Sequence, residues 1–433
     1  YSCTVDKSDK VCALRGAGAV LEAPMTRNTV NIPNVKFVDD NTALTAGPSI
    51  QATGKEVMAK AQKELDDWQA CSRVSGGTLN HTKTVTWICD HVWSDDHWRM
   101  RTDKSLPGTL HLEDEEGVRR PIKRLKPTED HKILGVHITA DHTWKAQTSQ
   151  LREQGIAFAA RVRTRKNKIK SDVWFATKSM IWASFSYPLR ALTLSWEQWN
   201  SIMSPVLEVC LPRSGMARNF PRVVLFGPQK YQGQGLSHPW YTQEIMKLGV
   251  MWEAFTKPSL ESDVLLTNME LLRMEFGTDS PMTDIPFSRM DKATTKSWVK
   301  SGWRSCQKFG LHIEDSLPKP TLKRQGDRFL MQLFCDDPNV SNSDLRLLQT
   351  QRMFLNVETM SDIVSACGTH ILASAYQGIP VETNLHNYIW PRRPNKLSDK
   401  HLRMWQLTLD KLVRNPHNQT KELTGQEVFE QNS

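Results

Sequence analysis

Two adjacent aspartates, Asp39 and Asp40, follow a run of β-forming residues, and a turn-prone asparagine and a second alternating apolar run come after them. This pattern predicts a β-hairpin that carries both carboxylates at its tip. Adjacent carboxylates repel each other and are costly to desolvate, so a bound divalent cation that supplies compensating charge would explain the pair. A solvated Asp-Asp-Asn turn is the alternative interpretation.

The residues after the expected hairpin predict a helix and then a strand. Thr53 and Glu56 have the spacing of a capping box, and an apolar stripe at helical spacing continues to about Cys71. The glycine pair at residues 76–77 ends this helix, and a strand is expected over residues 83–89.

The middle of the chain predicts a compact strand and a set of helices. The strand spans residues 132–138, and a long helix with an apolar stripe begins at Trp144 and becomes strongly basic near its end. Two further helical segments are expected at residues 173–210 and 239–275. A charged connector at residues 112–126 separates the first strands from this region.

Glycine and proline near residues 276–288 mark an expected domain boundary. Beyond it, the pattern predicts a helix that ends at Gly310, a helix at residues 343–355, a strand at 369–376 and a helix near 402–412. The tryptophans of this part are expected in the core because they recur at helical spacing: Trp298, Trp303, Trp390 and Trp405.

The composition limits the kind of protein. A length of 433 residues predicts two or three domains, and a net charge of +9 suits a polyanionic partner without requiring one. The eight cysteines are scattered, which indicates reduced thiols in an intracellular protein, without distinguishing nucleus from cytoplasm. There is no signal peptide and no apolar run of membrane-spanning length, so no membrane partner is expected. A first residue that is not Met indicates a fragment or a processed piece.

Four segments, taken in order, resemble the second half of the palm domain of reverse transcriptases, most closely those of non-LTR retrotransposons. The segments are Phe37-Val38-Asp39-Asp40, the capped helix, Ser75-Gly76-Gly77-Thr78-Leu79-Asn80 with Lys83, and Ile133-Leu134-Gly135-Val136. The resemblance covers residues 35–155 by motif and extends more loosely through a helical, thumb-like region to about residue 275.

The resemblance implies roles for three residues in RNA-directed DNA polymerisation. Asp39 would be a ligand of the two catalytic metal ions, Mg²⁺ or Mn²⁺, with Asp40 as a more peripheral carboxylate. Lys83 would stand near the pyrophosphate leaving group as a charge stabiliser or proton donor. A solvated lysine at the start of a strand is the alternative for Lys83.

The same resemblance implies contacts with an RNA template and a DNA primer, with deoxynucleotides as substrates. Leu134, Gly135 and Val136 would form the primer grip, although an ordinary buried strand with a bulge explains them equally well. The basic helix end, with Arg161, Arg165 and Lys168 as candidate contacts, would lie along phosphates. A solvated helix end that complements the helix dipole remains the alternative.

A second polar cluster, at residues 89–97, contains Cys, His and Asp side chains but lacks zinc spacing, and Cys89 is expected on the apolar face of its strand. We therefore expect a polar hairpin loop there and not a metal site.

Polymerases of this family also need a metal-binding aspartate on an earlier palm strand. The only aspartates before Asp39 are Asp6 and Asp9, in a segment without a strand pattern.

The sequence thus predicts an α+β fold in which a partial palm is followed by a mainly helical thumb-like region and a mixed α/β C-terminal region. The expected divisions are a partial palm at 1–126, a primer-grip-like segment at 127–155, a thumb-like region at 156–280 and an accessory region of unknown role at 290–433. Whether the chain is an enzyme stays open, because it is expected to be inactive alone. The alternative function is a non-catalytic nucleic-acid-binding remnant that uses the basic helix end and the connector.

Overall fold

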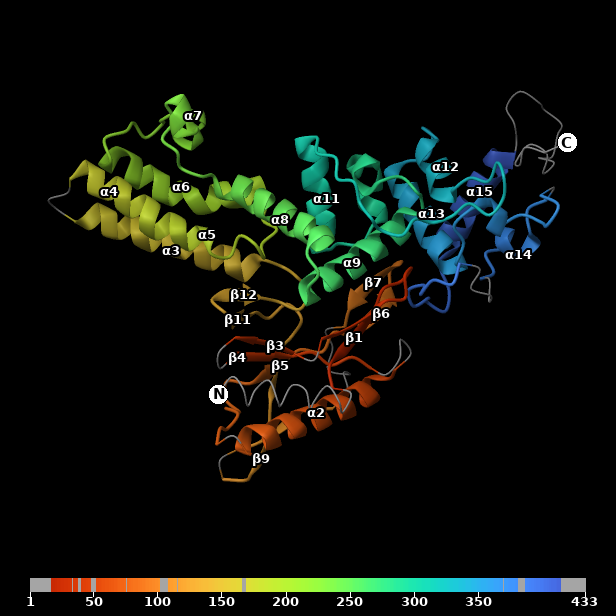
Figure 1. Cartoon of the computed structure of the whole chain (residues 1–433), viewed down its shortest axis with the longest axis horizontal. Helices are drawn as coiled ribbons and strands as arrows, with labels where there is room; N and C mark the ends of the chain where they lie inside the picture. The colour runs from red at the N-terminus through yellow and green to blue at the C-terminus, as the bar shows by residue number, and fades with distance from the viewer. Residues whose placement is uncertain are drawn as a thin grey trace.

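The protein has an α+β fold in which short strand pairs accompany a larger number of helices (Figure 1). The computed structural model describes residues 17–32, 34–37, 40–47, 52–74, 76–101, 108–114, 116–165, 169–368, 370–380 and 386–413. In the view of Figure 1, the strands and helix α2 occupy the lower part, and two groups of helices extend to either side above them.

The described part of the N-terminal region contains two-stranded pairs and the long helix α2 (Gly54–Val74). Antiparallel pairs are formed by β1 (Ala19–Glu22) with β2 (Thr29–Ile32), β3 (Asn34–Phe37) with β4 (Asp40–Ala43), β6 (His91–Ser94) with β7 (His97–Met100), β8 (His111–Glu113) with β9 (Arg119–Pro121), and β11 (His131–Ile133) with β12 (Val136–Ile138). The short strands β5 (Val85–Thr86) and β10 (Lys123–Arg124) pair in parallel. A small core around Leu112 joins the apolar face of α2 to this region.

Helix α2 begins where the capping box predicts. The Thr53 hydroxyl accepts a hydrogen bond from the Glu56 amide at 3.4 Å, and the Glu56 carboxylate accepts from the Thr53 amide at 2.7 Å. The predicted helix is therefore confirmed, and it continues three residues beyond Cys71. The strand expected at 83–89 is shorter than predicted, with only Val85–Thr86 paired.

A helical bundle follows the strand pairs. Its elements are α3 (Lys145–Thr164), α4 (Lys170–Ala176), the π-helix η1 (Thr177–Trp182), α5 (Ala183–Ser186), α6 (Trp196–Arg213), α7 (Arg222–Phe226), the 3₁₀ turn η2 (Gln229–Tyr231) and α8 (Pro239–Thr256). Helices α3 and α6 pack closely because Gly155 has no side chain: a Cβ there would lie 3.1 Å from Val206 Cγ2. The single helix expected at 173–210 is wrong, because residues 187–195 interrupt it.

The C-terminal region is also mainly helical. It contains α9 (Leu260–Phe276), η3 (Met282–Asp284), α10 (Phe287–Met290), η4 (Asp291–Ala293), α11 (Trp298–Phe309), α12 (Leu330–Asp336), α13 (Asn342–Leu355), η5 (Met360–Asp362), α14 (Ala373–Tyr376) and α15 (Asp399–Val413). The helices predicted to end at Gly310 and to span 343–355 and 402–412 are confirmed. Trp303 and Trp405 are fully buried, in agreement with their expected core role.

Two features of the C-terminal region differ from expectation. The strand expected at 369–376 is wrong, because residues 373–376 form helix α14, and Ile371 makes an isolated bridge to Val364. The core also runs through residues 276–288, where a boundary is expected: Phe276 and Met282 belong to the same buried cluster as Met251 and Trp405.

Candidate nucleic-acid interface

The residues on either side of the acidic pair form two antiparallel strands. In β3 and β4, Phe37 lies opposite Asp40, and Asn34 lies opposite Ala43. Asp40 begins strand β4, but its side chain lies outside the described part of the structure, and Asp39 lies outside it altogether. The hairpin is therefore confirmed, and the metal-binding roles of Asp39 and Asp40 stay predictions.

Lys83 lies on a turn just before β5. The turn is built by Asn80, whose side-chain oxygen accepts hydrogen bonds from the amides of Thr82 and Lys83 at 3.0 and 3.2 Å. The Lys83 side chain is exposed and has no ion-pair partner among the described residues. It is a free cation next to a strand, which suits both the phosphate and the solvated interpretation.

Residues 131–138 form a tight hairpin and not the single compact strand that the sequence predicts. Ile133 pairs with Val136, and the two residues between them, Leu134 and Gly135, both have positive φ, at 49° and 82°. This is the backbone of a type I′ turn, which glycine adopts freely but leucine adopts only at a cost. The turn presents Gly135 to solvent, whereas Val136 points into the protein.

Two hydrogen bonds connect the hairpin to the helical bundle. The Tyr187 hydroxyl donates a hydrogen bond to the Leu134 carbonyl at 2.7 Å, and the His137 amide donates to the Gln147 side chain at 2.7 Å. A cavity of about 240 Å³ lies at this junction. Gln147, Gln150, Gln154, Ser184 and Tyr187 contribute polar side chains to its lining, together with Gly135, Leu151 and Pro188.

One face of α3 connects this cavity to the basic end of the helix. Gln150, Gln154 and Arg161 are spaced by four and seven residues, so successive side chains lie above one another on that face. Arg165 follows after another four residues, at the C-cap. The distance from Gln147 to Arg161 along the helix is about 21 Å at 1.5 Å per residue. The opposite face carries Arg163, two residues from Arg161.

The arginines at the end of α3 have no carboxylate partner among the described residues, and all are exposed. Several cations of the connector are ion-paired: Arg119 pairs with Asp66 at 2.9 Å, and Lys123 pairs with Glu129 at 2.6 Å. Lys168 lies outside the described residues, so its predicted role is untested. The end of α3 therefore carries positive charge that has no carboxylate partner among the described residues.

The polar cluster at residues 89–97 forms the predicted hairpin loop. Strands β6 and β7 are joined by Asp95 and Asp96, which both have positive φ. Asp96 accepts a hydrogen bond from the Ser398 hydroxyl at 2.9 Å, which gives it a structural role. Cys89 does not lie on a strand face as expected, because strand β5 ends at Thr86, and the cysteine is exposed. No group of three or more His, Cys, Asp or Glu side chains suited to a metal occurs among the described residues.

Sequence reasoning missed Tyr187 and the three glutamines of the cavity. Nothing in the local pattern distinguishes Tyr187 from other residues of a helical segment, because its partner is 53 residues away. The spacing of the glutamines could have been noticed, since positions 147, 150 and 154 recur at helical spacing on α3.

Comparison with known proteins adds no identification: no protein-family model, no curated protein and no solved structure matches this chain. A search of the described helices for one of sufficient length and apolar character to cross a bilayer found none.

Proposed function

We propose that this chain forms the primer-binding part of a reverse-transcriptase-type polymerase, with the Leu134–Gly135 turn and one face of α3 in contact with a primer–template duplex. The observation that carries the proposal is the continuous face from Gly135 through Gln150 and Gln154 to Arg161. From Gln150 to Arg161 this face measures about 17 Å, which corresponds to about five base-pair steps of about 3.4 Å. The unpaired arginine at its far end supports a phosphate contact.

The adjacent carboxylates of the hairpin do not by themselves make a complete site for the two metal ions that the resemblance implies. Two Mg²⁺ ions need several convergent oxygen ligands, and an adjacent carboxylate pair supplies too few. We therefore assign no catalytic step to the chain alone. In template-directed nucleotidyl transfer, Asp39 and Asp40 would contribute metal ligands and Lys83 would contribute positive charge near the leaving group.

This part of the proposal is tested by Mg²⁺-dependent primer extension with an active polymerase that contains residues 1–433. Replacement of Asp39 by alanine should abolish extension while primer–template binding persists, because Asp39 is distant in sequence from the α3 face. Equal extension by the Asp39→Ala variant would remove this residue from the mechanism.

A non-catalytic nucleic-acid-binding protein is the second candidate, and the unpaired arginines of α3 favour it equally because they do not depend on the acidic hairpin. Binding of a fluorescent primer–template duplex to the whole chain, measured by anisotropy at several salt concentrations, tests the binding function common to both candidates. We expect affinity to fall steeply with salt as counterions are released from phosphates. An affinity independent of salt would exclude phosphate contacts as its basis.

A further inference from the structure

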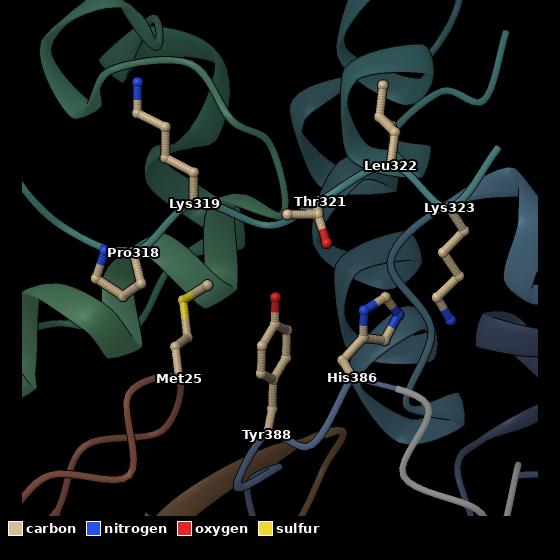
Figure 2. Close-up of a pocket in the computed structure, with 8 residues that line it drawn as sticks. All are labelled: Met25, Pro318, Lys319, Thr321, Leu322, Lys323, His386 and Tyr388. Atoms are coloured by element: carbon tan, nitrogen blue, oxygen red, sulfur yellow. The ribbon is translucent and has the colours of Figure 1, made fainter. Parts of the chain in front are cut away.

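A cavity of about 500 Å³ in the C-terminal region has walls from three distant segments: the turn around Met25, residues 318–323 and residues 386–388 (Figure 2). The charged groups of one wall are engaged with each other. Lys323 pairs with the buried Asp362 carboxylate, which also accepts a hydrogen bond from His386 Nε2 at 2.7 Å. Figure 2 shows the Lys319 ammonium directed away from the hydroxyl groups of the cavity. The charged groups therefore join two segments of the fold, and we assign the cavity no ligand.

Helix α8 lies where the helical bundle meets the C-terminal helices, and its buried side contains three polar side chains (Figure 1). Gln243, Glu244 and Lys247 are each at most 1% exposed. The Lys247 ammonium pairs with the Glu244 carboxylate at 3.0 Å, and the Gln243 amide donates to the same carboxylate at 2.8 Å. The Ser305 hydroxyl of α11 also donates to Glu244, and the Trp199 indole of α6 donates to the Gln243 side chain at 3.0 Å. These bonds fix the rotation of α8 about its own axis.

The side of α8 that faces solvent is apolar. Tyr241, Ile245 and Trp252 are 47%, 65% and 57% exposed, and Met246 at the edge of this side is 40% exposed. At about 100° per residue, Tyr241, Ile245, Gly249 and Trp252 lie within about 80° around the helix and along about 16 Å of its length. We call these five residues the α8 face. A rotation of the helix that buried them would expose its hydrogen-bonded polar groups, so the exposed apolar surface is a fixed feature of the fold.

The α8 face carries no charge. Between Trp240 and Trp252 the only charged side chains are Glu244 and Lys247, and these are buried and paired with each other. The whole chain has a net charge of +9, so most approaches of one copy to another meet repulsion. Two copies that meet through the α8 face place no like charges opposite each other. This neutrality makes the face complementary to a second copy of itself.

Gly249 lies near the middle of the α8 face, four residues after Ile245 and three before Trp252. It is exposed, and a Cβ added there would meet nothing within 4 Å. A glycine inside an exposed helix weakens that helix relative to alanine, so its presence favours a role in close approach. If two antiparallel α8 helices cross at Gly249, their backbones can approach closely, and Trp252 of each copy lies opposite Met246 of the other.

We propose that the α8 face is a self-association surface, through which two copies of the chain pair about a two-fold axis near Gly249. Its two half-exposed aromatic side chains offer about 100 Å² each, and the whole face offers roughly 300–400 Å². The pair therefore buries less than about 1,200 Å² in total, which is the size of a weak, reversible complex. We expect a dissociation constant of about 10–100 µM. This surface is separate from the α3 face and does not depend on the function proposed for it.

The test is sedimentation equilibrium of the whole chain at about 1–200 µM, in the absence of nucleic acid. We expect the weight-average mass to rise with concentration toward that of a dimer. Ile245→Glu should weaken dimerisation at least about tenfold, because the two-fold axis places the introduced charge in the interface twice. Ile169→Glu is the matched control: Ile169 is 67% exposed, immediately precedes α4, and should leave the association unchanged when replaced.

Gly249→Leu distinguishes a specific helix crossing from non-specific apolar adhesion. Leucine adds apolar surface and favours the helix, but it would hold the two backbones apart, so we expect dimerisation to weaken about tenfold while circular dichroism shows the fold retained. A native chain that stays monomeric up to about 200 µM would overturn the proposal and leave the face to a different apolar partner. Equal effects of Ile245→Glu and Ile169→Glu, or stronger association of Gly249→Leu, would overturn it as well.

Discussion

The Tyr187 hydroxyl donates a hydrogen bond to the Leu134 carbonyl across 53 residues of sequence, and this bond ties the Leu134–Gly135 turn to the helical bundle. Tyr187→Phe should release the turn while leaving the bundle intact. Because Tyr187 is 67% exposed, we expect a loss of less than about 1 kcal/mol in the free energy of unfolding. Hydrogen exchange should become faster at residues 131–138 and unchanged in α6. Unaltered exchange in the hairpin would show that the bond does not restrain it.

Leu134 has a backbone conformation that leucine disfavours, so replacing it should stabilise the protein. Leu134→Asn creates the Asn-Gly pair that type I′ turns prefer, and we expect the free energy of unfolding to rise by about 0.5–1 kcal/mol. Urea denaturation measures the change, with Ile133→Asn as a contrast that should destabilise. A loss of stability in Leu134→Asn would mean that leucine packing outweighs the backbone cost.

His238 should make the stability depend on pH. Burial lowers the pKa of His238 to about 4, and its Nδ1 accepts a hydrogen bond from the Trp240 amide at 3.1 Å. Between pH 6.5 and 4 the unfolded chain binds a proton that the folded chain does not, so stability should fall as the pH is lowered through this window. The contribution is at most about 1.4 kcal/mol per pH unit.

The matched variant for this prediction is His238→Asn, because asparagine can also cap helix α8 but does not titrate. Its unfolding free energy, measured from pH 4 to 7, should vary less steeply than that of the native chain. Parallel pH profiles for the two proteins would exclude His238 as the titrating group.

Arg352 should be among the residues on which the C-terminal core most depends. Its guanidinium is fully buried, pairs with Glu358 at 3.1 Å and donates to the Glu275 carbonyl at 3.3 Å near the end of α9. Arg352→Met would leave the Glu358 carboxylate buried and unpaired, so we expect a loss of about 3–5 kcal/mol in the free energy of unfolding. Arg346→Met on the same helix is the control, because Arg346 is exposed and its loss should cost less than about 0.5 kcal/mol. Similar losses for the two variants would contradict this account.

Elements with local signals were predicted well. The reciprocal Thr53 and Glu56 hydrogen bonds fix the start of α2, and Gly310, with φ of 60°, ends α11 where the sequence places it. These features depend on residues a few positions apart, which is why a single sequence reveals them.

Elements that depend on distant contacts were predicted poorly. Leu134 gives no turn signal because leucine rarely has positive φ, and only the Tyr187 contact explains its position. Residues 373–376 form a helix whose Ala375 carbonyl accepts a hydrogen bond from the Trp405 indole, 30 residues away. The cavity around Tyr388 was missed for the same reason, since its walls come from three separated segments.

The central claim is that one face of α3 contacts nucleic acid, and Arg161 and Arg163 form the pair that tests it most directly. Both are exposed arginines in the last turn of α3, and they point to different sides of the helix. The measurement is the affinity of the whole chain for a primer–template duplex against salt, with Arg161→Gln and Arg163→Gln compared. We predict that Arg161→Gln weakens binding and reduces the salt slope by about one unit, while Arg163→Gln changes neither. Equal effects of the two substitutions, or none from Arg161→Gln, would contradict the account.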